Sequence, residues 1–417
     1  MYLNYDIDES LVKLSNEVEE VIKNEFKKAD EICLFNSAKV LSAFQKHKVS
    51  TSDFLEITGY GFYDSGRDKL EQIYADIFKA EDALVRPQIM SGTHALSLTL
   101  FGLLKHGDTF ISISGDPYDS LLSVIGISGN SRNSLIANGV KYEQIDLINS
   151  DFDYEKIKER LAKNDVKMVE IQRSRGYSQR KSLTINQIEK VCTTIREVNK
   201  DVIIMVDNCY GDFVEKKEPI EVGADLIVGS LMKNLGGGLA KTGGYIVGKK
   251  EFIYDIAERF SAPCLAKNIG ANLNQNLNFY KGLYMAPNAV KNSIKTAVFA
   301  SCMLEKLGYD VCPKYNEEKT DIIQTITLNS GDNLVKFCQG IQFGSPVDSF
   351  VTPIAAPMDG YPHDEVMAGG SFISGSTIEL SCDGPMISPY TAFMQGGLTY
   401  EYGKLGILLA LNKIKKQ

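Results

Sequence analysis

Short apolar runs alternate with amphipathic stretches between residues 83 and 250. Each run has the length and apolar character of a buried strand, and helical periodicity separates most of them, as in residues 183–200. Strands that alternate with helices predict a mostly parallel sheet covered on both faces. Near-continuous apolar strands fit that burial. The predicted strands are 83–90, 109–114, 141–146, 166–172, 202–207, 225–229 and 244–248.

The two ends of the chain have a different pattern. Residues 10–46 carry apolar side chains at steps of three and four, which predicts helices. After residue 285 a long amphipathic helix that runs toward a strand (292–312), strands at 320–328 and 375–382, and a final helix at 398–414 predict a smaller α+β domain. We therefore expect an α/β protein with three parts: an N-terminal helical segment (1–55), a large domain (56–285) and a small C-terminal domain (286–417).

Composition and charge narrow the class of protein. The chain has 417 residues, 44% of them apolar, with a net charge of −8, which argues against a general nucleic-acid surface. Its cysteines are scattered and the opening "MYLNYDIDES" lacks a signal peptide, so we expect reduced thiols and a cytoplasmic location. Because the histidines are scattered, we expect no structural metal. Because no apolar run reaches the roughly 20 residues that span a bilayer, we expect no membrane span.

Polar residues follow three of the predicted strands, where active sites of such sheets lie. Ser91, Gly92 and Thr93 form a small-residue turn that opens a helix, and such a turn offers free N–H groups to a phosphate. Asp207 ends the strand 202–207, and Lys233 follows the strand 225–229 in the glycine-rich stretch "GSLMKNLGGG". Each feature alone has an ordinary structural explanation, such as a helix cap.

Together the three features fit one cofactor, pyridoxal 5′-phosphate (PLP). In a PLP enzyme, a lysine of the protein forms a Schiff base with the cofactor, a carboxylate keeps the cofactor's pyridine nitrogen protonated, and a turn holds its phosphate. Lys233 therefore becomes the predicted Schiff-base lysine, and we expect burial to shift its amine toward the neutral form. Lys241 is the rival lysine, but it lies nearer the next strand and lacks the hydroxyl that Ser230 places three residues before Lys233.

At this point the chain resembles the methionine gamma-lyase-like family, also called the aluminium-resistance protein family, of fold-type-I PLP enzymes. The resemblance covers nearly the whole chain. It is carried by the segments "SGTHA" (91–95), "GDPYDSL" (115–121), "QRSRGY" (172–177), "VDNCYGDFVE" (206–215), "GSLMKNLGGGLAKTGGYIVG" (229–248) and the stretch 346–385. It implies a fold-type-I large domain and a homo-oligomer, a dimer or tetramer, with active sites at the subunit interfaces.

The resemblance also implies roles for individual residues. Lys233 would carry the Schiff base, Asp207 would pair with the pyridine nitrogen, and Ser91, Gly92, Thr93 and Ser230 would surround the phosphate. Tyr118 is the positional match for a tyrosine that stacks on the ring, and His94 competes for that role. A tyrosine and arginine pair from the neighbouring subunit would be Tyr63, or Tyr60, with Arg67.

Substrate binding departs from the usual pattern of these enzymes. They hold the substrate carboxylate with an arginine of the C-terminal domain, but this chain has no arginine after Arg259. Arg173 and Arg175, which follow the strand 166–172, are the candidates because a guanidinium fork suits a carboxylate. The implied activity is carbon–sulfur elimination on a methionine- or cystathionine-like amino acid. Alternatives are an aldolase, an aminotransferase, or a PLP-binding stress-tolerance protein with little catalysis.

Overall fold

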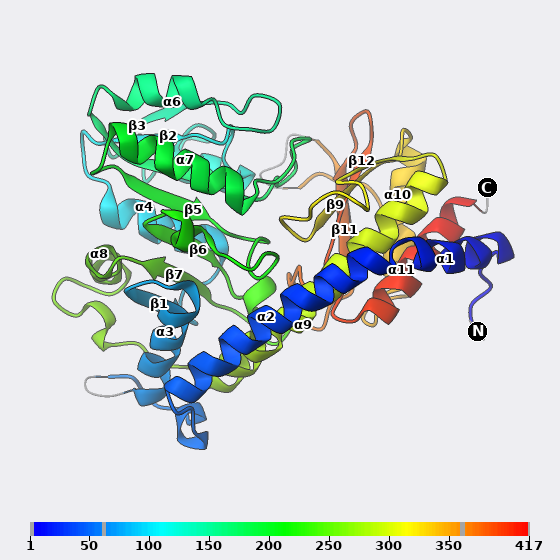
Figure 1. Cartoon of the computed structure of the whole chain (residues 1–417), viewed down its shortest axis with the longest axis horizontal. Coiled ribbons are helices and arrows are strands. Elements are labelled where there is room, and N and C mark those ends of the chain that lie inside the picture. The colour runs from blue at the N-terminus through cyan, green and yellow to red at the C-terminus, as the bar shows by residue number, and fades with distance from the viewer. Residues whose placement is uncertain (1–3, 61–63, 359–362, 416–417) are drawn as a thin grey trace. The chain divides into compact units, whose positions relative to one another are not determined.

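The computed structural model describes residues 4–60, 64–358 and 363–415 (Figure 1). By its contacts the chain forms two compact units, one of residues 37–284 and one of residues 1–36 with 285–417. Two long helices, α2 (Lys23–Lys46) and α9 (Asn276–Lys306), contribute residues to both units. The three-part division proposed from the sequence is a different description of the chain and stays a prediction.

A seven-stranded sheet forms the centre of unit 37–284, and the prediction of a mostly parallel sheet is confirmed. Five neighbouring strands, β6, β5, β4, β2 and β3, run parallel, whereas β7 is antiparallel to both β6 and β1. The order across the sheet is β1-β7-β6-β5-β4-β2-β3. The strands are β1 (Asp82–Arg86), β2 (Thr109–Ser112), β3 (Lys141–Gln144), β4 (Val166–Gln172), β5 (Ile203–Asp207), β6 (Leu226–Ser230) and β7 (Gly244–Gly248).

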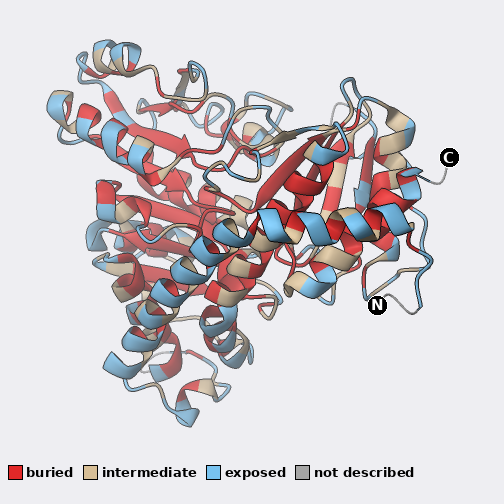
Figure 2. Cartoon of the chain, turned by 45° about the vertical axis from the view of Figure 1, so that its right-hand side comes forward, coloured by how far each residue is buried: buried red, intermediate tan, exposed pale blue. Residues whose placement is uncertain are grey.

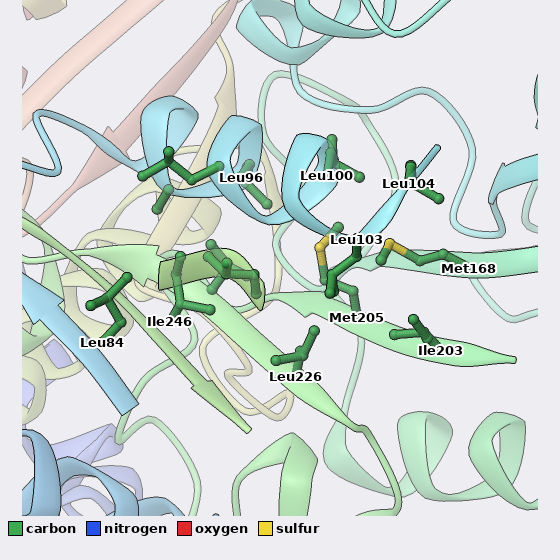
Figure 3. Close-up of a cluster of buried hydrophobic side chains, with 14 of the residues drawn as sticks. Leu84, Leu96, Leu100, Leu103, Leu104, Met168, Ile203, Met205, Leu226 and Ile246 are labelled. Atoms are coloured by element: carbon green, nitrogen blue, oxygen red, sulfur yellow. The ribbon is translucent and has the colours of Figure 1, made fainter. Parts of the chain in front are cut away.

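Helices cover both faces of this sheet. On one face α4 (Gly92–Leu103), α5 (Asp119–Ile125) and α8 (Lys250–Phe260) share a core with the strands. Figure 3 shows Leu96, Leu100 and Leu103 of α4 above Met168 and Met205 of the sheet. Burial of each such side chain contributes about 1.5–3 kcal/mol. Figure 2 shows the central strands of the sheet mostly buried.

On the opposite face α3 (Ser65–Phe78) packs against β7. The rings of Tyr74 and Phe78 each lie 5.9 Å from the ring of Tyr245, which alternates with Ile246 of the first core. Helices α6 (Tyr154–Leu161) and α7 (Ile185–Val198) pack against each other along the chain between β3 and β5. The predicted alternation of strands and helices is therefore present over this unit.

The second unit has its own sheet, which is antiparallel throughout, as expected for an α+β domain. Its order is β10-β11-β12-β9-β8, and helix α10 (Gly331–Phe343) packs against three of its strands and against α11 (Tyr400–Lys415). Helix α1 (Glu9–Val21) packs on α11. The strands are β8 (Asp310–Cys312), β9 (Ile323–Thr327), β10 (Glu365–Ala368), β11 (Ser381–Pro385) and β12 (Thr391–Gln395).

One predicted strand of this unit, 375–382, is mostly wrong, because β11 begins only at Ser381. The carboxylate of Glu379 accepts hydrogen bonds from the backbone N–H groups of Phe372 and Ile373, at 2.8 and 3.1 Å. These local bonds hold the preceding segment as a loop, although its alternating sequence is typical of a strand.

Two further searches were made over the described part of the chain. None of its helices combines the length and apolar character that crossing a bilayer requires. Within the same residues, His, Cys, Asp and Glu side chains form no group of three or more that could hold a metal ion.

Candidate active site

The carboxyl end of β5 places Asp207 on the face of the sheet that α4 covers. Asp207 lies beside Gln172 of β4 and Val228 of β6, and it points to the same side as Met205, two residues earlier. Met205 packs beneath the leucines of α4 (Figure 3). Helix α4 follows β1, so its N-terminus lies at the same edge of the sheet as Asp207.

The first turn of α4 brings the predicted phosphate-binding residues close to this edge. Ser91 is the N-cap, and its hydroxyl accepts the backbone N–H of His94 at 3.1 Å. A Cβ atom on Gly92 would lie 3.3 Å from Cys209 Sγ and 3.5 Å from Ser230 Cβ. Thr93 Oγ1 is 2.6 Å from the hydroxyl of Ser120. Ser91, Gly92 and Ser230 therefore converge on the turn that follows Asp207, with no acidic residue in the helix's first turn.

Lys233 is half-buried in this region. Its Nζ atom lies 3.9 Å from the ring centroid of Tyr210 and 5.9 Å from that of Tyr118. Burial lowers the pKa of this amine, but Cys209, Tyr210 and Asp207 raise it by more, so the net pKa lies above the ordinary value. The net direction is therefore opposite to the shift toward a neutral amine that was expected from burial. The rival Lys241 is exposed.

Cys209 connects the carboxylate to the lysine. Its backbone N–H donates to Asp207 Oδ1 at 3.0 Å. Burial, followed by the charge of Asp207, raises the pKa of the Cys209 thiol far above its usual range, so the group stays protonated. Its side chain also interacts with both Asp207 and Lys233. The thiol is therefore a proton-bearing neighbour of both predicted catalytic groups.

The two candidates for ring stacking occupy different positions. Tyr118 stands at the N-cap position of α5, and its ring stacks on Tyr177 at 6.5 Å. His94 is half-buried, which lowers its pKa, and its Nδ1 atom accepts the backbone N–H of Met90 at 3.2 Å. Tyr118 is thus close to Lys233, whereas His94 is a neutral imidazole in the first turn of α4. Their roles stay predictions.

The structure favours a structural role for Arg173. Its guanidinium is fully buried and donates to Asn208 Oδ1 at 2.8 Å, to the Gly211 carbonyl at 2.9 Å and to Glu215 at 2.6 Å. Glu218 lies 3.6 Å away. These partners occupy both terminal nitrogens of the fork that the sequence suggested for a substrate carboxylate, whereas Nε has no hydrogen-bond partner among the described residues. Arg175 is also buried, with its backbone N–H donating to the Ser182 hydroxyl, and it remains the candidate for the substrate.

The predicted contribution of a neighbouring subunit falls on the loop before α3. Tyr63 lies outside the described residues, and Tyr60 is 89% exposed. Arg67 is buried within its own unit, where Nε donates to Asp68 and Nη1 to the Gly270 carbonyl. Its assignment to a phosphate of another subunit stays a prediction.

Sequence reasoning missed several residues of this site. Tyr210 has the shortest ring distance to Lys233 of the two tyrosines, and Cys209 contacts Asp207, yet neither was named as a site residue. They stand two and three residues after Asp207 in "DNCYGD", so their position just past the end of a strand could have identified them as site residues. Gln172 was missed as well, although the parallel register places it beside Asp207.

Comparison with known proteins gives the family. The model of the methionine gamma-lyase family matches residues 11–415. The chain belongs to this family. It is 45% identical to the uncharacterized protein YnbB of Bacillus subtilis strain 168, over 98% of this chain and 97% of that protein. The family predicted from the sequence motifs is thereby confirmed.

Solved structures agree with this assignment. A protein from Clostridium acetobutylicum is 46% identical, with a TM-score of 0.95 over 98% of this chain and 96% of its own. A carbon-sulfur lyase involved in aluminum resistance from Clostridium novyi NT is 44% identical, with a TM-score of 0.94 over 98% of this chain and 96% of its own.

More distant members of the family's structural class share the fold. The PLP-dependent protein YhfS from Escherichia coli has a TM-score of 0.61 at 17% identity, over 91% of this chain and 95% of its own. CalE6, a methionine gamma lyase from Micromonospora echinospora, has a TM-score of 0.57 at 18% identity, over 84% of this chain and 87% of its own. The predicted fold-type-I architecture is confirmed.

Proposed function

We propose that this protein is a PLP-dependent lyase that cleaves a carbon–sulfur bond of an amino acid. The observation that carries the proposal is the convergence of a half-buried lysine, Lys233, a carboxylate, Asp207, and the N-terminus of α4 at one edge of the sheet. The family supports PLP as the cofactor, and the carbon-sulfur lyase of Clostridium novyi supports the reaction class.

The residues at this edge fit PLP. Helix α4 begins with the small residues Ser91 and Gly92, whose N–H groups and helix dipole suit a phosphate. Asp207 shares the covered face with that turn, so one flat ligand could reach both. The amine of Lys233 lies near the rings of Tyr118 and Tyr210. When bound, PLP supplies an aldehyde for an amino group and a ring that accepts electrons.

The protein's own residues would then manage protons. Asp207 holds a proton at the pyridine nitrogen, and Lys233 takes the proton from the α carbon of the substrate. Once Asp207 pairs with a ring cation, it no longer raises the pKa of Lys233 as strongly, which favours the neutral amine that a base requires. Tyr118 or Lys233 returns a proton to the departing thiol.

The substrate is the finer part of the proposal. The resemblance favours a methionine- or cystathionine-like amino acid, and the Clostridium acetobutylicum protein is provisionally named a cystathionine beta-lyase involved in aluminum resistance. Arg175 would hold the substrate carboxylate, because Arg173 is already paired inside the protein. The proposal includes a homo-oligomer in which Tyr63 and Arg67 complete a neighbour's site.

The cofactor and its lysine are tested by absorbance. Purified protein incubated with excess PLP is expected to turn yellow and to be labelled by borohydride on a peptide that spans residues 229–238. Lys233→Ala should lose the band, whereas Lys241→Ala, a matched change of an exposed lysine in the same loop, should keep it. Colourless protein, or a band lost in Lys241→Ala but kept in Lys233→Ala, would contradict the proposal.

The reaction is tested with a panel of substrates. Methionine and cystathionine should release a thiol together with a 2-oxo acid and ammonia. Aldehyde release from threonine would instead indicate an aldolase, and amino transfer to a 2-oxo acid an aminotransferase. A yellow protein that turns over none of these would point to PLP binding with little catalysis.

A further inference from the structure

Glu170 is a second buried carboxyl on the face of the sheet that carries Asp207. It lies on β4 between Ser112 of β2 and Met205 of β5, in parallel register. Asp207 follows Met205 by two residues, so the two carboxyl side chains project from neighbouring strands to the same side. Glu170 is fully buried. A carboxyl in such a position needs either partners or a proton.

Neither oxygen of Glu170 has a hydrogen-bond partner among the described residues. The hydroxyl of Ser112 is near enough to affect it, but it donates to the Gly115 carbonyl at 2.7 Å. Asp207 differs, because its Oδ1 atom accepts the backbone N–H of Cys209. Asp207 thus accepts a backbone hydrogen bond, whereas both oxygens of Glu170 lack one among the described residues.

The charged and titratable groups around Glu170 come from several elements. The pKa of Glu170 is raised to about 7. Burial is the largest cause and the charge of Asp207 adds to it, whereas Ser112 and Arg180, from the loop after β4, act in the opposite direction. Tyr142 of β3 faces it as a neutral phenol whose pKa burial and Glu170 raise. With a pKa of about 7, Glu170 keeps its proton over the mildly acidic range in which an ordinary glutamate is ionised.

We propose that Glu170 is a positioning residue for Asp207: a neutral carboxylic acid that leaves the negative charge at the strand end on Asp207 and ionises when Asp207 pairs with a cation. The inference rests on the proposed function, in which that cation is the protonated ring of PLP. Glu170 acts through Asp207 and needs no contact with substrate or cofactor.

The first arm of the test uses protein without added cofactor. Glu170→Gln keeps the size of the side chain and removes the titration. A buried carboxyl with a raised pKa loses stability as pH rises from its unfolded pKa, near 4.5, to its folded one, near 7. The unfolding constant of the wild type relative to Glu170→Gln should therefore rise on the order of 100-fold between pH 4 and pH 8.

Urea titrations at each pH measure this ratio. A ratio that stays constant with pH would show that Glu170 does not hold its proton and would overturn the inference. If Glu170→Gln fails to fold, Glu170→Met provides a second side chain of similar length without a titrating group.

The second arm measures protons released when PLP binds at pH 7, by calorimetry in two buffers of different ionisation enthalpy. A cation at Asp207 lowers the pKa of Glu170, so the wild type should release a few tenths of a proton per site more than Glu170→Gln. Equal release by the two proteins would overturn the coupling. If the wild type binds no PLP, the proposed function fails and the coupling fails with it, whereas the first arm still reports whether Glu170 holds a proton.

Discussion

Arg173 is a single side chain for which a structural role and a substrate role predict different measurements. Its guanidinium is fully buried against Glu215 and Glu218. Removing one partner of a buried ion pair leaves the other charge uncompensated, which costs about 3–5 kcal/mol. We expect Arg173→Ala to lose that much free energy of unfolding in urea titrations. Arg132→Ala, a change of an exposed arginine, should alter stability by less than about 0.5 kcal/mol.

A substrate role for Arg173 would give the opposite result. Stability would be unchanged while KM for the amino acid rose. That outcome would contradict the structural assignment and return Arg173 to the site beside Arg175.

A site residue could be predicted when its own place in the sequence identified it, and could not when its role depends on partners far away along the chain. Asp207 and Lys233 were found because each follows its own strand, and the ends of parallel strands meet at one edge. The glutamates that pair with Arg173 stand 42 and 45 residues further along the chain (215 − 173 and 218 − 173). A sequence read in order cannot show that pairing. Glu170 was hidden for a similar reason, because its apolar strand gave no sign that its carboxyl lacks partners.

Ser91, the N-cap of α4, bears on two separate properties: the stability of the helix and the proposed binding of the phosphate. The Ser91 hydroxyl caps the helix, and replacement of such a cap by alanine costs about 1 kcal/mol. Ser91→Asp keeps a capping oxygen but adds a negative charge where the phosphate is proposed to bind. We expect Ser91→Ala to lower stability, whereas Ser91→Asp should keep stability and weaken PLP binding by at least about tenfold.

Urea titration and PLP titration of both variants separate the two properties. Unchanged PLP affinity in a stable Ser91→Asp protein would place the phosphate elsewhere. Ser91→Thr, which keeps a neutral hydroxyl cap, is the control and should change both measurements little.

At the level of strands and helices the sequence was a good guide where periodicity and burial agree. All seven strands of the large sheet were predicted, and six of them are buried along most of their length, whereas the edge strand β3 is partly exposed. The direction of β7 was not predicted, since an apolar run has the same composition whichever way it runs. The segment 375–382 was wrong because Glu379 binds the loop that precedes it, and hydropathy carries no information about such a bond.

Over the whole molecule, buried carboxyls of two kinds set the response of stability to pH. Burial would raise the pKa of Glu71, but Arg86 and Lys267 lower it by more. Its contribution is present above its unfolded pKa and is lost as pH falls through its lowered folded pKa. Glu170 and Asp212 are of the second kind, because burial raises their pKa values, to about 7 for Glu170. Their cost grows as pH rises from about 4 toward those folded values.

These opposite slopes predict that the protein is most stable at mildly acidic pH, near 5, and less stable at pH 8. Asp212 accepts hydrogen bonds from Asn208 and Tyr245 and is repelled by Glu218, so an amide at this position keeps the shape without the titration. The double variant Asp212→Asn, Glu170→Gln should therefore flatten the decline above pH 5 and leave the decline below pH 4 in place, since Glu71 is untouched. Thermal unfolding at constant ionic strength from pH 3.5 to pH 8 measures both slopes. A wild-type midpoint that rises steadily up to pH 8 would show that these two carboxyls are ionised in the folded protein, and it would remove the physical basis on which Asp207 and Glu170 were given different protonation states.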